Sequence, residues 1–218
     1  MNTKGIFIAI EGPIGVGKTT LANVLNEHFG YTLLREIVEE NPFLSKFYTD
    51  IKEYALQTEA FFLFNRVKQL EDVQKNVLSK NNGVVSDYHI VKNLIFAGLT
   101  LDKMQFHRYK QVYNTFVSDL PQPDIIVYLN SNTDTLMKRI AQRDRSFERQ
   151  MDINYIDGLS LEYKYYFNPL SIKHNFMGKE PIIIEIDNSN LDVLNSQDDR
   201  QFVIDKVEKA ISTLGGDN

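Results

Sequence analysis

The sequence contains no cysteine among its 218 residues. This absence excludes disulfide bonds, thiol catalysis and cysteine-based zinc sites, and it is compatible with a reducing compartment. The sequence also lacks an apolar run long enough to span a bilayer. Its first residues, MNTKGIFIAIEG, lack the basic region and the long apolar segment of a secretion signal. We therefore expect a soluble cytoplasmic protein with no membrane partner.

An excess of positive charge is also missing, because the formal net charge is -5. Sequence-independent binding to nucleic-acid phosphates is therefore disfavoured, and a small-molecule partner fits better. Internal repeats and low-complexity tracts are absent as well. With 43% hydrophobic residues the chain can bury one substantial core, so we expect a single domain over residues 1–218.

Short β-branched runs alternate along the chain with amphipathic segments of helical length. The strand candidates are 5–11, 31–36, 83–87, 124–129 and 181–187, and the helix candidates lie near 18–29, 42–80, 89–118, 133–142, 152–172 and 200–213. This alternation predicts an α/β protein with a doubly wound fold, in which a five-stranded parallel sheet is flanked by helices.

The most specific motif is GPIGVGKTT, which follows the first predicted strand and precedes the first predicted helix. Its GxxxxGK[ST] spacing predicts a P-loop, whose backbone N–H groups cradle phosphates at a helix N-terminus. Lys18 is expected to bridge phosphate oxygens, and Thr19 to offer its hydroxyl to Mg²⁺. A chance glycine-rich turn is the weaker alternative. The residues predicted to bind ATP are Gly12, Pro13, Ile14, Gly15, Val16, Gly17, Lys18, Thr19 and Thr20.

The GTPase strings N-K-x-D and D-x-x-G are missing from the sequence, so a GTPase is disfavoured. Two carboxylates do stand at the ends of predicted strands: Glu36 follows the second strand and Asp87 ends the third. Since ligands of open α/β sheets collect at the carboxyl ends of strands, both should face the P-loop. One could accept the proton of an attacking hydroxyl while the other holds Mg²⁺ through water. A helix N-cap is the alternative for Asp87.

Three arginines, Arg139, Arg143 and Arg145, lie close together in LMKRIAQRDRSFER after the fourth predicted strand. A solvated basic face is the usual explanation for such a cluster. A transferring phosphoryl group, however, needs cations on its oxygens, so we favour a mobile lid over about 139–150 that supplies them.

The helical segment YALQTEAFFLFNR carries Glu59 and Arg66 on one face, about 10.5 Å apart along the helix. Burying a carboxylate and a guanidinium in an apolar stripe is costly unless a partner satisfies them. That partner could be a ligand. A direct Glu59–Arg66 salt bridge is the structural alternative.

Taken together, GPIGVGKTT, REIVEENP, the helix with Glu59 and Arg66, SDYHI and RDRSFE resemble, in order and spacing, the deoxyribonucleoside kinase family. The resemblance covers nearly the whole chain. It implies a P-loop kinase-type fold and transfer of the γ-phosphate of ATP, or another nucleoside triphosphate, to the 5′-hydroxyl of a deoxynucleoside. It also implies Mg²⁺ as cofactor and a homodimer with a helical interface.

The same resemblance assigns roles to individual positions. Glu36 matches the carboxylate that acts as base, and Asp87 matches the acid of an E/D-R-S triplet. Tyr48 and Glu148 match the pair that binds the 3′-hydroxyl, with a core residue and an exposed lid charge as their respective alternatives. Phe96 matches an aromatic that packs on the base, and it too could be a core residue. Three arginines match the lid (Arg139, Arg143 and Arg145), and the polar loop near 188–199 matches the loop over the donor's adenine.

The sequence departs from the family pattern at three places. Tyr88 and His89 stand where Arg and Ser usually follow the acid, so the arginine that commonly orients the 5′ end is missing. Asp144 replaces the usual glycine between the lid arginines, which should stiffen that turn. Glu59 stands where many relatives have Gln.

The third departure bears on the base. An ionised Glu59 only accepts hydrogen bonds, which suits N1–H and N2–H₂ of guanine, while Arg66 could donate to O6 and N7. Adenine would place the lone pair of N1 against the carboxylate. Deoxyguanosine is therefore the favoured acceptor, with a deoxyadenosine or broad-specificity kinase, a nucleoside monophosphate kinase and a non-catalytic nucleotide sensor as alternatives.

Overall fold

Five parallel strands form the centre of the protein, seen in a computed structural model that describes residues 5–168 and 180–214. The strands are ordered β2-β3-β1-β4-β5 across the sheet. Their bounds are β1 (Phe7–Glu11), β2 (Thr32–Leu34), β3 (Val84–Ser86), β4 (Ile125–Asn130) and β5 (Ile182–Asp187). The predicted α/β architecture with a five-stranded parallel sheet is confirmed.

The central strand β1 is buried along its whole length. Its sequence, FIAIE, shows no alternation of polar and apolar residues, as expected for a parallel strand covered on both faces. Ala9 is in register with Ser86 of β3 on one side and with Ile126 of β4 on the other. Glu11, at the carboxyl end of β1, is thereby brought to the sheet edge where ligands collect in such folds.

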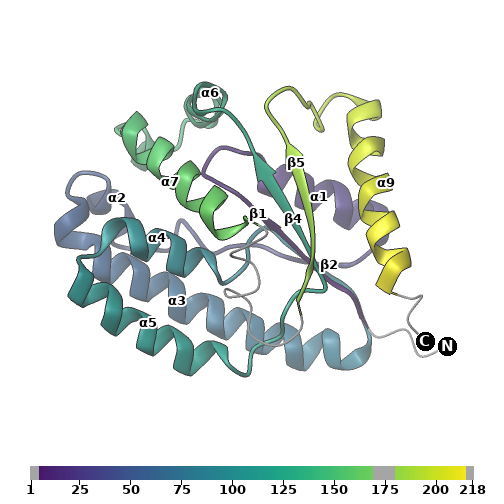
Figure 1. Ribbon diagram of the computed structural model, residues 1–218, viewed down its shortest axis with the longest axis horizontal. Helices are drawn as coiled ribbons and strands as arrows, with labels where there is room; N and C mark the ends of the chain where they lie inside the picture. Colours follow the sequence, from purple (N-terminus) through teal and green to yellow (C-terminus); the bar gives the residue numbers. More distant parts are fainter. Residues whose placement is uncertain (1–4, 169–179, 215–218) are drawn as a thin grey trace.

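Helices cover both faces of the sheet (Figure 1). One face carries α3, α4 and α5, and the other carries α1 and α9, with a hydrophobic cluster beneath each group. Near the carboxyl ends of the strands, α7 packs against α4 and α6. The helix bounds are α1 (Lys18–Phe29), α2 (Leu44–Phe47), α3 (Ile51–Asn76), α4 (Lys92–Thr100), α5 (Lys103–Val117), α6 (Thr133–Arg143), α7 (Ile153–Tyr166) and α9 (Gln197–Leu214), with short 3₁₀ turns η1 (Leu78–Lys80) and η2 (Ser146–Glu148).

The helix predicted over 42–80 is wrong as a single element. The chain forms the short α2, turns, and starts again at α3, whose N-cap Asp50 accepts a hydrogen bond from the backbone N–H of Glu53 at 3.2 Å. An aspartate side chain in this position satisfies a helix N-terminus, so it begins a new helix rather than continuing the old one. The break separates Tyr48 from the long helix that carries Glu59 and Arg66.

The helix predicted over 89–118 is also two elements, α4 and α5. Asp102 accepts from the backbone of Gln105 at 2.8 Å, and the Gln105 side chain accepts from the backbone N–H of Asp102 at 3.4 Å. This reciprocal pair is a capping box, which fixes the start of α5. The remaining differences lie at element ends: α7 ends at Tyr166, and α9 starts at Gln197 rather than at 200. Residues 169–172 of the predicted helix lie outside the described residues.

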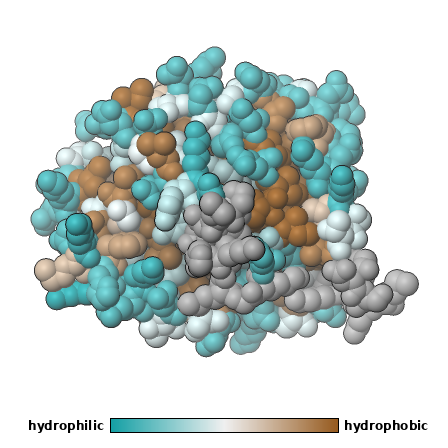
Figure 2. Space-filling model, in the orientation of Figure 1, coloured by the Kyte–Doolittle hydropathy of each residue, from teal (hydrophilic) through white to brown (hydrophobic). Residues whose placement is uncertain are grey.

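The surface is mixed in character. Hydrophilic residues cover most of the face in Figure 2, and hydrophobic residues gather where the edge strand β5 lies beside α9. Ile182 and Ile184 of that strand are only partly buried. Within 5–168 and 180–214, no helix is both long and apolar enough to cross a membrane.

Candidate active site

The P-loop connects the central strand to α1. Gly15 and Gly17 have φ angles of 83° and 100°, in the left-handed region that glycine adopts without strain. Lys18, the first residue of α1, donates to the carbonyls of Gly12 at 2.7 Å and Pro13 at 3.0 Å, and burial lowers its pKa to about 8. The backbone of the P-loop therefore folds around the Lys18 side chain. The loop leads into the N-terminus of α1, where backbone N–H groups suit phosphate oxygens.

Asp87 links the P-loop to Glu36. Its Oδ2 accepts from the Thr19 hydroxyl at 2.7 Å, and its Oδ1 accepts from the Glu36 backbone N–H at 2.8 Å. The N-cap of α4 is Val91, so the helix-capping alternative for Asp87 is wrong. The two residues that follow β2 and β3 are thus neighbours, and both line a cavity together with P-loop residues, as predicted. The Glu36 carboxylate itself points away from Asp87. Thr19 and Asp87 together offer hard oxygen atoms of the kind that Mg²⁺ prefers.

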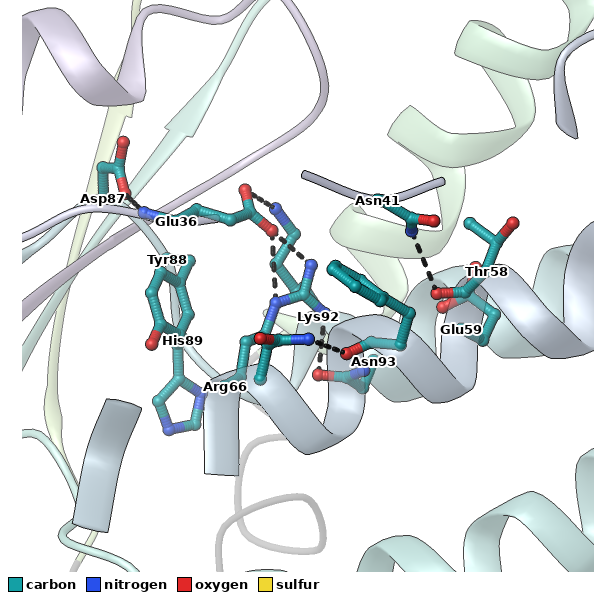
Figure 3. Close-up of polar contacts among 12 residues, drawn as sticks. Glu36, Asn41, Thr58, Glu59, Arg66, Asp87, Tyr88, His89, Lys92 and Asn93 are labelled. Atoms are coloured by element: carbon teal, nitrogen blue, oxygen red, sulfur yellow. Dashed lines mark hydrogen bonds and ion pairs between the residues drawn. The ribbon is translucent and has the colours of Figure 1, made fainter. Parts of the chain in front are cut away.

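The Glu36 carboxylate is held by a cation at each oxygen (Figure 3). Arg66 donates to Oε1 through Nη2 and, at 3.1 Å, through Nε, and Lys92 donates to Oε2 at 2.7 Å. A further N–H of Arg66 donates to Asn93 at 2.7 Å. Arg66 from α3 and Lys92 from α4 therefore fix the orientation of Glu36, which follows β2.

Glu59 lies apart from this cluster. The predicted alternative of a Glu59–Arg66 salt bridge is wrong, because Glu36 reaches Arg66 and takes its place. Glu59 is only 2% exposed, and its carboxylate makes no hydrogen bond or ion pair within the described part of the chain. The neighbouring Thr58 hydroxyl is also buried without a hydrogen-bond partner there. Glu59 and Arg66 do line one cavity, as their shared helix face predicted.

The two buried glutamates have opposite electrostatic surroundings. Burial alone would raise the pKa of Glu36, but Lys92 and Arg66 outweigh it and lower that pKa to about 2. At Glu59, burial dominates over the more distant Arg66 and Lys92 and raises the pKa to about 8. The ionised Glu59 expected from the sequence therefore predominates only above about pH 8 in the empty cavity.

A single cavity of about 970 Å³ connects these groups, which is at the upper end of the range for small-molecule sites. It runs from the P-loop past Glu36 to Glu59. Of the predicted P-loop residues, Ile14, Gly15, Gly17, Lys18, Thr19 and Thr20 line it. Its lining also includes four aromatic residues and three arginines (Tyr48, Phe62, Phe96 and Phe147; Arg139, Arg143 and Arg145) together with residues 188–195.

Tyr48 and Phe96 face this cavity from two helical segments. The Tyr48 ring is stacked with that of Phe147, with centroids 6.3 Å apart and planes at 6°. The Phe96 ring meets that of Tyr163 edge-on at 6.4 Å. Both residues are only partly buried: each lines the cavity and also packs against the hydrophobic core.

Glu148 is clamped by Arg143. The guanidinium donates to both carboxylate oxygens, at 2.6 and 2.7 Å through Nη2 and at 3.1 Å through Nε. Glu148 is 5% exposed, so the alternative of an exposed lid charge is wrong. Arg145 lies 3.7 Å from Glu148 and 3.7 Å from Glu39. Instead of the solvated basic face that was the alternative to a lid, Arg143 and Arg145 form an ion-paired cluster with Glu148 at the cavity edge.

Arg139 contacts the polar loop after β5. It donates to the carbonyls of Asn188 at 3.0 Å and Leu191 at 3.2 Å. The loop predicted over 188–199 is shorter, because α9 already begins at Gln197. Asp144, after the last residue of α6, adopts φ 49°. Its side chain is paired with Arg149 at 2.7 Å on the surface.

Comparisons with known proteins show the family of this chain. A profile described as deoxynucleoside kinase matches residues 8–212. The chain belongs to the deoxynucleoside kinase family. This kinase is 44% identical over 199 residues to the deoxyguanosine kinase of Bacillus subtilis (strain 168), covering 91% of this chain and 94% of that protein. It is 26% identical to the deoxyadenosine/deoxycytidine kinase of the same organism, covering 95% and 94% of the two chains.

Solved structures extend the comparison to the whole fold. The kinase aligns with a deoxyadenosine kinase from M. mycoides with a TM-score of 0.78 and 26% identity, covering 94% of this chain and 100% of that one. That structure holds the products dCMP and a flexible dCDP. A second structure of the same enzyme, at TM-score 0.78 and 25% identity, holds dATP and covers 93% and 99% of the two chains.

The sequence interpretation missed Lys92 and Asn93 of the kinase. Both are buried, and both bind residues that were predicted, Glu36 and Arg66. A signal was present, because IVKNLIFAG places a lysine and an asparagine in an otherwise apolar run, just as the segment around Glu59 does. A buried charge in such a run needs a partner, and that requirement could have identified Lys92.

Proposed function

We propose that the kinase transfers the γ-phosphate of ATP, or another nucleoside triphosphate, to the 5′-hydroxyl of deoxyguanosine, giving dGMP for nucleotide salvage in the cytoplasm. The observation that carries the choice of base is the buried Glu59 carboxyl group, which lines the acceptor cavity without a hydrogen-bond partner in the described residues. The 44% identity to a deoxyguanosine kinase supports the same choice.

The base fits between Glu59 and the aromatic walls of the cavity. An ionised Glu59 accepts from N1–H and N2–H₂ of guanine, and Phe96 packs on the ring. Arg66 is bound to Glu36 and Asn93, but these bonds use only part of its N–H groups. Arg66 can therefore still donate to O6 or N7 of guanine. Tyr48 and Glu148 are the proposed contacts of the 3′-hydroxyl.

The reaction uses positioning and charge more than covalent chemistry. Glu36 is the proposed proton acceptor, because its carboxylate is ionised and is held by Arg66 and Lys92 in the cavity that the P-loop also lines. Lys18 and the lid arginines (Arg139, Arg143 and Arg145) are the proposed cations around the phosphates. Thr19 and Asp87 would hold Mg²⁺, with Asp87 acting through water, and the ion would neutralise charge on the donor phosphates.

The kinase also carries an apolar surface that fits the proposed homodimer. Phe64 of α3 and Phe116 of α5 are 48% and 43% exposed, and their rings meet edge-on with centroids 5.4 Å apart. Leu56 and Val112, on the same two helices, are 42% and 41% exposed. Exposed apolar side chains grouped on two adjacent helices are typical of a protein–protein interface.

The test is a coupled assay for ADP formation with each deoxynucleoside and each deoxynucleoside monophosphate as acceptor. Deoxyguanosine should give the highest kcat/KM. Arg66 and Lys92 place two cations on the acceptor side of the cavity. Both are ion-paired with Glu36, so neither is a free cation for an acceptor phosphate, and a monophosphate acceptor is disfavoured. Faster turnover of a monophosphate would refute the proposal, and deoxyadenosine as the best acceptor would refute the choice of base.

A further inference from the structure

Lys92 is a buried cation that none of the motifs contains. It is the first residue of α4, its side chain is 6% exposed, and the surrounding sequence is largely apolar. This position is unfavourable in two ways. Burial removes water from the ammonium group, and a helix N-terminus already carries partial positive charge. A contribution to helix stability therefore does not explain a lysine here.

The partner that holds Lys92 is Glu36. The ammonium nitrogen lies 2.7 Å from Oε2, while Arg66 occupies Oε1, so neither oxygen is free to rotate away (Figure 3). The Phe96 ring, one helical turn further along α4, lies 5.4 Å from the same nitrogen. Lys92 thus stands between the carboxylate and the aromatic wall of the acceptor cavity.

Of the described residues that directly precede α4, neither Tyr88 nor His89 supplies a charge to Glu36. Tyr88, where the family resemblance led us to expect an arginine, donates its hydroxyl to Gln69 at 3.0 Å. Burial lowers the pKa of His89 to about 4, so its imidazole is neutral at pH 7. The positive charge is instead provided from the first turn of α4.

We propose that Lys92 is a positioning residue that keeps the Glu36 carboxylate oriented toward the 5′-hydroxyl of the acceptor. The inference rests on the proposed function, in which Glu36 accepts a proton. In that step the 5′-oxygen bonds to the γ-phosphorus of the donor. The bond between the γ-phosphorus and the bridging oxygen breaks, and its electron pair leaves with the nucleoside diphosphate. The hydroxyl proton passes to Glu36, and Lys92 itself forms and breaks no covalent bond.

The loss of Lys92 should therefore lower kcat and leave KM for the deoxynucleoside nearly unchanged. Lys92→Met keeps most of the length of the side chain and removes the ammonium group. We expect kcat to fall by roughly 10–100-fold because the base is misplaced. Lys92→Arg keeps a cation that can donate to Oε2 of Glu36, so it should recover most of this kcat.

A double-mutant cycle separates this role from a structural one. If Lys92 acts through Glu36, adding Lys92→Met to Glu36→Gln should lower kcat by less than about 3-fold further. The control is Lys68→Met, which removes an exposed lysine paired with Asp72 at 2.8 Å and should leave kcat and KM unchanged. If Lys92→Met does not fold, Lys92→Gln is used for the same measurements.

An unchanged kcat in Lys92→Met, or fully multiplicative losses in the cycle, overturns the inference. Its failure can be told from failure of the proposed function by the single variant Glu36→Gln. Near-normal turnover of that variant removes the base role and this inference together. If Glu36→Gln is slow and the losses in the cycle are multiplicative, the role of Lys92 is refuted and the base role of Glu36 stands.

Discussion

At the scale of single residues, the site depends on two buried glutamates that the protein treats differently. Glu36 has a cation at each oxygen, and its pKa is lowered to about 2 despite burial. Glu59 has no close partner in the described residues, and burial raises its pKa to about 8. The cations around Glu36 keep its side chain ionised at all working pH values. The burial of Glu59 leaves a carboxyl group whose protonation a ligand can change.

Replacing Glu36 by Gln keeps the shape of the side chain but removes the proton acceptor. We expect kcat to fall by roughly 10²–10⁴-fold, with little change in KM for the deoxynucleoside, because the interaction is needed in the transition state. Steady-state kinetics measure this, with the exposed Glu40→Gln as control. Near-normal turnover would exclude Glu36 and would make Asp87 the candidate base.

Glu59 should release a proton when deoxyguanosine binds. Below about pH 8 the empty cavity holds Glu59 mainly protonated, whereas guanine N1–H and N2–H₂ need the ionised form. Binding at pH 7 should therefore release close to one proton, and affinity should rise with pH up to about 8 and then level off. Calorimetry in buffers of different ionisation enthalpy measures the proton count. A count near zero would show that guanine binds the protonated form.

At the scale of helices and strands, the sequence predicted the elements better than their breaks. Hydrophobic patterning identifies all five strands because parallel strands buried on both faces read as continuous apolar runs. The breaks at Asp50 and Asp102 depend on single capping side chains, which a window of periodicity averages out. Asp102 and Gln105 do have capping-box spacing, so that break could have been predicted from the sequence.

The site was predictable where strand ends determine it and not where helix packing does. Asp87 and Glu36 follow neighbouring strands, so topology alone brings them together. The Lys92–Glu36 and Arg66–Glu36 pairs join residues 56 and 30 positions apart, and they depend on how α3 and α4 pack over the sheet. The helical periodicity of α3 predicted correctly which face carries Arg66, but it could not predict that Glu36 is the partner of Arg66.

The segment after α6 provides a prediction at this scale. Arg143→Ala removes a cavity-lining guanidinium and leaves the buried Glu148 without its bidentate partner. We expect kcat to fall by roughly 10²–10³-fold, as for other donors to charge that develops in transfer, together with a rise in deoxynucleoside KM through Glu148. Arg149→Ala breaks the exposed pair with Asp144 and should change either value by less than about 2-fold. Equal losses in both variants would contradict a role for Arg143 in transfer.

At the scale of the whole molecule, the exposed apolar face of α3 and α5 predicts self-association. Phe64→Glu places a charge in the centre of that face and should convert a dimer to a monomer in analytical ultracentrifugation. Phe202→Glu on α9 is the matched control, because Phe202 is 47% exposed but lies on the opposite side of the sheet. A wild-type monomer, or dissociation by the control variant alone, would contradict the proposed interface.

The central claim is that Glu59 selects guanine in the acceptor cavity, and the ratio of kcat/KM for deoxyguanosine to that for deoxyadenosine tests it most directly. Glu59→Gln supplies a donor for adenine N1 and loses a charge-assisted acceptor for guanine. The ratio should therefore fall by roughly 10–150-fold, with deoxyinosine affected less because it lacks N2–H₂. Glu71→Gln, on the exposed side of α3, should leave the ratio unchanged. Should Glu59→Gln lower kcat/KM for all three nucleosides by the same factor, Glu59 does not read the base and the guanine assignment is wrong.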